Sequence, residues 1–332
     1  MASLYAAWVP EDRIIHTNVW SSELAKLVAN AMLAQRISSM NSISALCERT
    51  GADVREIAKA VGTDERIGSK FLNSGLGFGG SCFRKDLSSL VYIAESLNLP
   101  DVADYWRSVL TLNMFQRQRF SNKIIDRANN TLVGKKITLL GFAYKKNTGD
   151  TRESLAVDVV STLLPERPLE IAIFDPCCPK ADIEREIATF QDAKERVKIY
   201  SDPYSACLGA STIAILTEWD LFKADIPPPV LTNKAKYSSK TGVHITGSPL
   251  QIFTPSALPR CSPTCQKCIS SDSISYVESN QRLDWARIAK HMKHPRYILD
   301  GRGVLDERIM NGYGVELEGL GWGGRAFVQH PR

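Results

Sequence analysis

The 332-residue sequence lacks the features of membrane, secreted and nucleic-acid-binding chains. Its apolar runs fall well short of the roughly 18 residues that a membrane-spanning helix needs. Residues 1–10 lack the basic start and long apolar core of a secretory signal. The 41 basic and 36 acidic residues are interspersed, so the net charge of +5 is not gathered in a tail. We therefore expect a cytoplasmic protein that binds neither membrane nor nucleic acid. Its mildly basic balance suits an anionic small substrate, or merely solubility.

The eight cysteines are too sparse in so long a chain to be a disulfide framework, and they are typical of cytosolic thiols. Cys261, Cys265 and Cys268 have a spacing that suggests zinc. His291 and His294 lie too far along the chain to complete a standard site, so we expect no metal.

Long segments without proline or glycine predict an all-helical unit over residues 18–130. Apolar residues recur at helical spacing in segment 19–47, where Ser21 or Ser22 can cap the helix. Further helices are expected at 53–61, 87–97 and 102–129. Helices this long in so small a unit usually pack against a partner, so we expect a second chain.

The pattern changes near residue 135, where short apolar runs begin to alternate with helical segments. Strands are expected at 137–141, 169–175, 197–200 and 211–216, with later strands at 297–300 and 314–320. The helices between the first four are expected at 154–164, 181–196 and 203–208. This alternation indicates an α/β fold with a parallel sheet. Segment 227–280 is rich in proline, serine and threonine and is predicted to be a disordered insertion.

The segment Gly75-Leu-Gly-Phe-Gly-Gly80 matches the residue pattern G-x-G-x-x-G of dinucleotide-binding loops, but not its structural context. The fingerprint needs a preceding strand, and residues 66–74 do not form an apolar run. We favour a loop whose backbone lies close to a ligand, where only glycine permits the approach. A plain flexible loop is the alternative.

Cys82 follows this loop and precedes Arg84, Lys85 and a predicted helix. A thiol at a helix N-terminus beside cations has a lowered pKa and can act as a nucleophile. A buried, inert cysteine is equally compatible with the sequence. Asp86 could accept a proton or hold water near the thiol, or merely complement the helix N-terminus.

Two further groups of polar residues suggest a site. Lys26 and Asn30 stand four residues apart on one helix face and could reach the same polar group, although a solvated face explains the spacing as well. Lys145, Lys146 and Arg152 follow a strand, and Arg302 follows another. Ligands of open α/β sheets bind at this edge, and both cation types suit phosphate. A basic surface loop is the alternative.

Several long sequence motifs of this chain, taken in their order along it, resemble those of the UDP-glucose/GDP-mannose dehydrogenase family. They are residues 20–30, 35–39, 77–86, 141–146, 148–154 and 300–302. The resemblance implies oxidation of UDP-glucose to UDP-glucuronate with two reductions of NAD. It also implies that 1–17 are the remnant of an N-terminal NAD-binding domain, that 18–130 are a central dimerisation domain, and that 131–332 are a Rossmann-like UDP-binding domain.

The resemblance further implies roles for single residues. Cys82 would form a thiohemiacetal and then a thioester that water hydrolyses. Lys26 would stabilise the oxyanion or handle its proton, and Asn30 and Asp86 would surround substrate and water. The implied sugar-nucleotide contacts are Arg66 (toward a neighbouring subunit), Asn73, Gly75, Phe78, Gly79, Tyr144, Lys145 and Arg302. The implied NAD contacts are Cys82, Phe83, Arg84, Lys85 and Arg152.

The family begins with a strand that leads into a true G-x-G-x-x-G, and these 332 residues contain no such pair. We therefore expect a truncated homologue. The first hypothesis is an NAD-dependent dehydrogenase of UDP-glucose in a homodimer or higher oligomer. The alternative is an inactive homologue that binds UDP-sugar or dimerises with a full-length paralogue.

Overall fold

The structure is a computed structural model, and it describes residues 1–224 and 282–322. The predicted insertion and the three cysteines Cys261, Cys265 and Cys268 lie outside the described residues. Within these residues, no helix is both long and apolar enough to cross a membrane.

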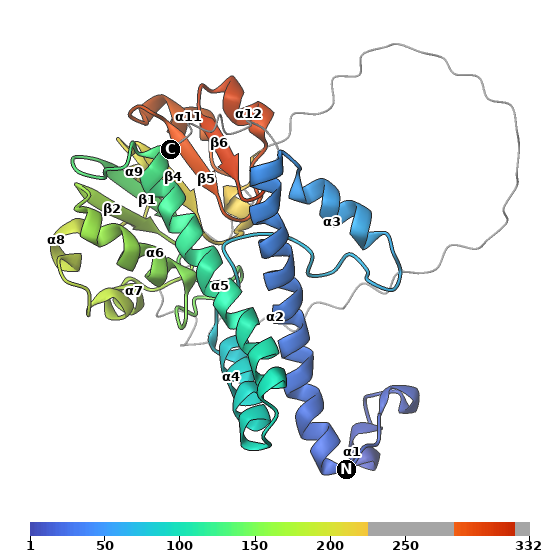
Figure 1. Ribbon diagram of the computed structural model, residues 1–332. Coiled ribbons are helices and arrows are strands. Elements are labelled where there is room, and N and C mark those ends of the chain that lie inside the picture. Colours follow the sequence, from blue (N-terminus) through green and yellow to red (C-terminus); the bar gives the residue numbers. More distant parts are fainter. Residues whose placement is uncertain (225–281, 323–332) are drawn as a thin grey trace, which may run out of the picture. The chain divides into compact units, whose positions relative to one another are not determined.

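The first half of the chain is helical, as predicted (Figure 1). After the short α1 (Ala2–Tyr5) and η1 (Glu11–Arg13) come α2 (Val19–Thr50), α3 (Val54–Gly62), α4 (Ser81–Ser96) and α5 (Pro100–Arg127). The side chain of Asn18, rather than Ser21 or Ser22, caps α2 by accepting the Ser21 amide at 2.8 Å. Proline at the first position of α5 extends that helix two residues upstream of the prediction.

Helices α2, α4 and α5 pack against one another. Their core contains Ala31, Ala34, Leu87, Leu90 and Val109, together with Phe78 from the glycine loop. The spacing of these residues buries one stripe of each helix. The glycine loop is thus part of the helical core.

The second half forms a six-stranded, all-parallel sheet in the order β3-β2-β1-β4-β5-β6, which confirms the predicted α/β class. Strand order reverses between β1 and β4, the point where such sheets bind ligands. The strands are β1 (Lys136–Leu140), β2 (Glu170–Phe174), β3 (Val197–Ile199), β4 (Thr212–Ile215), β5 (Tyr297–Asp300) and β6 (Glu316–Gly319).

Helices follow most of the strands. The helix expected at 181–196 is wrong as one element, because the backbone turns at Asp192, whose φ is 63°, and the segment divides into two helices. The helical elements of this half are α6 (Leu155–Leu163), η2 (Leu164–Glu166), α7 (Lys180–Ile187), α8 (Ala193–Arg196), α9 (Pro203–Cys207), η3 (Asp220–Phe222), α11 (Trp285–His291) and α12 (Glu307–Gly312).

Helix α5 belongs to both halves. Its first turns pack on α2 and α4, while Phe120 and Ile124 near its end are buried in the core of the sheet with residues of α6. The two halves therefore form one compact unit. Because α5 is shared, loops of the helical half are held against the carboxyl edge of the sheet.

Candidate functional site

The glycine loop is held by buried side chains of α2 and α5. The amide of Gly75 donates to Asn41 Oδ1 at 2.9 Å, and its carbonyl accepts from Gln116 Nε2 at 2.6 Å. Asn113 bonds both backbone groups of Phe78, at 2.9 and 3.0 Å. A plain flexible loop would lack these bonds. Sequence reasoning missed the three amide side chains, because a polar residue on a helix normally faces water.

The glycines of this loop face other parts of the protein at close range. A Cβ on Gly75 would lie 2.9 Å from the carbonyl oxygen of Gly301, in the loop after β5. One on Gly79 would lie 2.7 Å from that of Glu153, in the loop after β1. The close neighbours at these two glycines are backbone atoms of the α/β half, and the expected approach of a ligand to the loop stays a prediction. The glycines therefore let the two halves meet.

Cys82 is the second residue of α4, which begins at Ser81, six residues before the predicted start. The prediction failed because Gly80 caps the helix without a side-chain hydrogen bond, so no capping residue marks the boundary. Cys82 is exposed, which rules out the buried, inert alternative.

The first turn of α4 is anchored to the loop after β1. Arg84 forms a 3.0 Å ion pair with Glu153, whose carbonyl also accepts the Gly80 amide at 3.1 Å. Arg152 chelates Asp150 at 2.9 and 2.7 Å. The pKa of Arg152 is raised, mainly by its hydrogen bonds to Asp150 and the negative charge of that carboxylate.

Lys26 and Asn30 reach one carboxylate, as the spacing allowed. Both side chains donate to Asp86 Oδ2, Asn30 at 2.6 Å. Asp86 is buried (1% exposed), while the Lys26 side chain remains 57% exposed. Burial raises the pKa of Asp86, but the two hydrogen bonds and the charges of Lys26 and Lys85 outweigh it, so the pKa lies below its usual value.

Asp86 also shares a helix face with the thiol, because it follows Cys82 by four residues on α4. Among the described residues, none donates a hydrogen bond to Asp86 Oδ1, and Lys85 Nζ lies 4.0 Å from it. Lys26 and Asn30 of α2 thus meet Asp86 of α4, four residues after Cys82 on the same helix.

At the other end of the loop lies a cavity of about 390 Å³ between the helical half and the carboxyl end of β5. Its polar wall includes Asn73 and Arg302, both predicted site residues. Arg302 is held from behind: its Nε donates to the Leu216 carbonyl at 2.7 Å and lies 3.4 Å from Glu218 Oε2. The lining residues are Val54, Arg55, Ala58, Lys59, Ser69, Leu72, Asn73, Ser74, Asp300, Gly301, Arg302, Gly303, Leu320 and Trp322.

The loop after β1 is fixed by Asp175, which sequence reasoning missed. Its carboxylate accepts the amides of Phe142 and Ala143 at 2.7 and 3.0 Å and the indole N–H of Trp219 at 3.1 Å. The amides of Cys177 and Cys178 donate to its other oxygen, both at 2.9 Å. This loop carries Tyr144 and Lys145.

The hydrogen bonds of Asp175 also decide whether this sheet can bind a dinucleotide. In dinucleotide-binding sheets of this strand order, an acid near the end of the second strand binds ribose. Asp175 follows β2, but its carboxylate is buried and already accepts five N–H groups. The described residues therefore do not fit NAD at this sheet.

Tyr144 and Lys145 lie beside the glycine loop. A Cβ on Gly80 would lie 2.8 Å from the Tyr144 ring, and Lys145 Nζ lies 5.4 Å from the centroid of that ring. Phe83 packs edge-to-face on buried Phe78, with ring centroids 5.7 Å apart. Arg66 is exposed and pairs with Asp64 in its own loop at 2.6 Å, so its contact with a neighbouring subunit stays a prediction.

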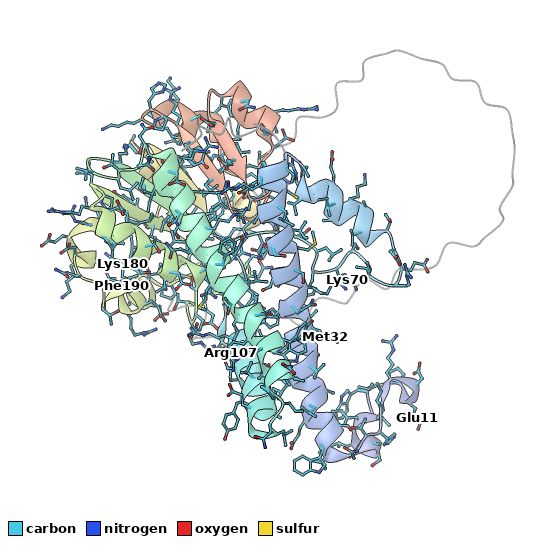
Figure 2. The ribbon with its side chains drawn as sticks, in the orientation of Figure 1. Glu11, Met32, Lys70, Arg107, Lys180 and Phe190 are labelled. Carbon is cyan, nitrogen blue, oxygen red and sulfur yellow. The ribbon has the colours of Figure 1, made fainter. Side chains whose placement is uncertain are left out.

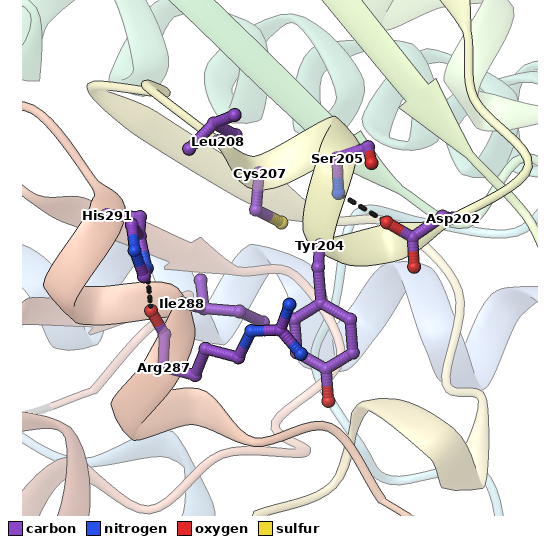
Figure 3. A pocket seen from close by; sticks show the side chains of 8 residues that line it. All are labelled: Asp202, Tyr204, Ser205, Cys207, Leu208, Arg287, Ile288 and His291. Carbon is purple, nitrogen blue, oxygen red and sulfur yellow. Dashed lines mark hydrogen bonds between the residues drawn. The ribbon is translucent and has the colours of Figure 1, made fainter.

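A second pocket, of about 140 Å³, lies between α9 and α11 and contains none of the predicted residues (Figure 3). The guanidinium of Arg287 lies 4.3 Å from the Tyr204 ring centroid, and Asp202 accepts the Ser205 amide at 2.6 Å. Its polar groups thus serve the local fold. Within the described ranges, no group of three or more His, Cys, Asp or Glu side chains is placed to hold a metal.

Two segments match domains of a known family. Residues 20–114 match the central domain of the UDP-glucose/GDP-mannose dehydrogenase family, and residues 138–238 match its UDP binding domain.

Curated relatives give the same picture. The chain is 56% identical over 324 residues to UDP-glucose 6-dehydrogenase of Caenorhabditis elegans, covering 97% of this chain and 55% of that protein. It is 53% identical over 327 residues to the Mus musculus enzyme, covering 97% and 53%. The chain thus spans about half the length of these relatives.

Solved structures are also similar. A UDP-glucose dehydrogenase from Pyrobaculum islandicum has a TM-score of 0.53 at 33% identity, over 60% of this chain and 44% of that one. A UDP-D-ManNAc dehydrogenase from Pyrococcus horikoshii has a TM-score of 0.62 over 97% of this chain and 56% of that one. At 21% identity, the second likeness concerns the fold alone.

Proposed function

This chain belongs to the UDP-glucose/GDP-mannose dehydrogenase family, and on that premise we propose that it supplies the nucleophile and the sugar-nucleotide site of a UDP-glucose 6-dehydrogenase. The observation that carries the proposal is that Lys26 and Asn30 of α2 both donate to Asp86 of α4, the helix that also carries the exposed Cys82. The relatives at more than half identity bear that enzyme's name.

In the proposed reaction, Cys82 attacks the aldehyde carbon of the oxidised sugar as a thiolate. The S–C bond forms while the carbonyl π electrons move to oxygen, which takes a proton from Lys26 Nζ. Asp86 holds Lys26 and Asn30 toward the reacting centre through its Oδ2. Its Oδ1 is an acceptor for a hydroxyl or a water. A positioned donor that meets the developing oxyanion lowers the barrier of such a step.

The oxidation itself needs a hydride acceptor, which NAD supplies in the activity we propose. Cys82, Phe83, Arg84, Lys85 and Arg152 remain proposed contacts for it. The sheet does not fit NAD, because Asp175 is saturated with donors. We therefore derive no step of hydride transfer from these residues.

We further propose that the diphosphate binds at the cavity and the sugar at Cys82. Residues 73–82 run continuously from one to the other, so a molecule with a nucleotide at one end and an oxidisable sugar at the other fits both. Arg302 and Lys145 are the proposed phosphate contacts, since charge-assisted hydrogen bonds to phosphate are the strong ones. Asn73, Gly75, Phe78, Gly79 and Tyr144 shape the passage between them.

A second copy of the chain is the proposed partner of the helical half. Large apolar side chains stay exposed on α2, α4 and α5, among them Tyr92 at 70%, Met114 at 59% and Met32 at 56%. Met32 is labelled in Figure 2. Exposed apolar side chains on a long helical surface are typical of an interaction site. Sedimentation at micromolar concentration should show a dimer or larger, and a monomer throughout would contradict this.

Limited alkylation tests the site. With a limiting reagent near neutral pH, mass spectrometry should show Cys82 labelled well before Cys47 and Cys207, which are buried and whose pKa values are raised by burial. UDP-glucose should slow labelling of Cys82 alone. Lys145→Ala and Arg302→Ala should each weaken this protection about ten-fold or more in ligand concentration.

Two results separate the hypotheses. Protection of Cys82 by UDP-glucose without turnover, even with NAD present, would favour an inactive UDP-sugar-binding homologue. Equal labelling of Cys82 and Cys207, unaffected by UDP-glucose, would contradict the proposed site itself.

A further inference from the structure

We propose that Lys59 of α3, which lines the cavity together with Arg302, is a second phosphate-binding cation there. The inference rests on the proposed function, because it assumes that the cavity receives a nucleoside diphosphate. It adds a contact from the helical half to a site whose other proposed phosphate contacts, Arg302 and Lys145, come from the α/β half.

The cavity has an excess of positive charge. Its lining contains Arg55, Lys59 and Arg302, and its only carboxylate among the described residues is that of Asp300. Asp300 is buried, and its two oxygens accept the amides of residues 302–305 at 2.7 to 2.9 Å. That carboxylate serves the loop after β5 and is not an ion-pair partner for the lysine.

The three cations differ in how their charges are balanced. Arg55 chelates Asp53 through Nε at 3.0 Å and Nη2 at 2.5 Å, and its guanidinium lies 4.2 Å from the ring centroid of Trp322. Arg302 faces Glu218 at 3.4 Å. Lys59 forms no ion pair or hydrogen bond with any of the residues that the structure describes.

The position of Lys59 on α3 explains why this charge matters. Arg55 and Lys59 are four residues apart on the nine-residue α3 and share one face, and Asp53 balances the charge of Arg55 but not that of Lys59. Both line the cavity. An anion bound in the cavity would give Lys59 the counter-charge that it lacks among the described residues, through a charge-assisted contact. A diphosphate between Lys59 and Arg302 would be held by both halves of the protein.

The test is titration of UDP into the full chain by calorimetry, with uridine as the uncharged comparison. Lys59→Gln should weaken UDP binding about ten-fold, equivalent to about 1.4 kcal/mol, and leave uridine binding unchanged. Lys59→Arg should restore most of the affinity. The matched control is Lys70→Gln, because Lys70 is an exposed lysine of the same half that does not line the cavity (Figure 2).

The outcomes are distinct. UDP binding of equal strength to wild type and Lys59→Gln would overturn the role of Lys59 while leaving the proposed function intact. Equal weakening of UDP and uridine would also overturn it, since that pattern indicates a change of shape rather than a lost charge contact. A wild-type chain that binds no UDP would refute the nucleotide site and this inference together.

Discussion

Asp86 in the helical half and Asp175 in the α/β half are both buried, at 1% and 9% exposure, yet they are used differently. Asp175 accepts five N–H groups, four of them from the backbone of two loops. Asp86 accepts two side chains at one oxygen, and one of these, Lys26, is largely exposed. A carboxylate whose oxygens all accept hydrogen bonds from the protein stabilises the fold. A carboxylate with a free oxygen, on the same helix as an exposed thiol, is available for chemistry.

Asp300 resembles Asp175, because its oxygens accept the amides of the loop after β5. In the α/β half, buried acids thus shape the loops that carry Tyr144, Lys145 and Arg302. In the helical half, the buried acid positions side chains. The comparison predicts that the two kinds of acid differ sharply in what their removal does to stability.

The largest effect is expected for Asp175→Ala. It should lower the free energy of unfolding by about 3–5 kcal/mol, because several buried N–H groups lose their acceptor and each unpaired group costs about 1–3 kcal/mol. Asp175→Asn, which keeps one acceptor oxygen, should lose clearly less. Urea denaturation measures both. A loss below about 1 kcal/mol for Asp175→Ala would break the comparison.

A smaller effect is expected for Asp86→Asn, about 1–2 kcal/mol by the same measurement. Lys26 can turn to water when its partner is lost, so little of the ion pair's strength appears in stability. UDP affinity should not change, since Asp86 does not line the cavity. Protection of Cys82 by UDP-glucose should weaken. A destabilisation as large as that of Asp175→Ala would show that Asp86 is architectural too.

The smallest effect concerns pH. The folded-state pKa of Asp86 is lowered, so its stabilisation is complete above the unfolded value near 3.9 and is lost as pH falls through the folded value. The difference in unfolding free energy between wild type and Asp86→Asn should therefore be constant above about pH 5 and shrink below about pH 4. A difference that grows on acidification would mean that the pKa is shifted in the opposite direction.

Local patterns predicted the elements with strong periodicity. The uninterrupted runs gave α2 and α5, and the apolar runs gave all six strands. The start of α4 was not predicted correctly, because Gly80 offers no capping side chain. The break between α7 and α8 at Asp192 was not predicted either, because the sequence does not indicate which non-glycine residue adopts a positive φ.

The residues of the chain by themselves determined the alternation of strands and helices, the motifs around Cys82 and the cations at the strand ends. Only the tertiary structure decided which groups meet. Lys26 and Asp86 are 60 residues apart, and Ser74 and the Leu320 carbonyl that it bonds are 246 apart. Periodicity reports which face of an element is apolar, but not which distant element covers it. That choice depends on how side-chain volumes and buried hydrogen bonds are satisfied together, as in the glycine loop held between two helices and two strand ends.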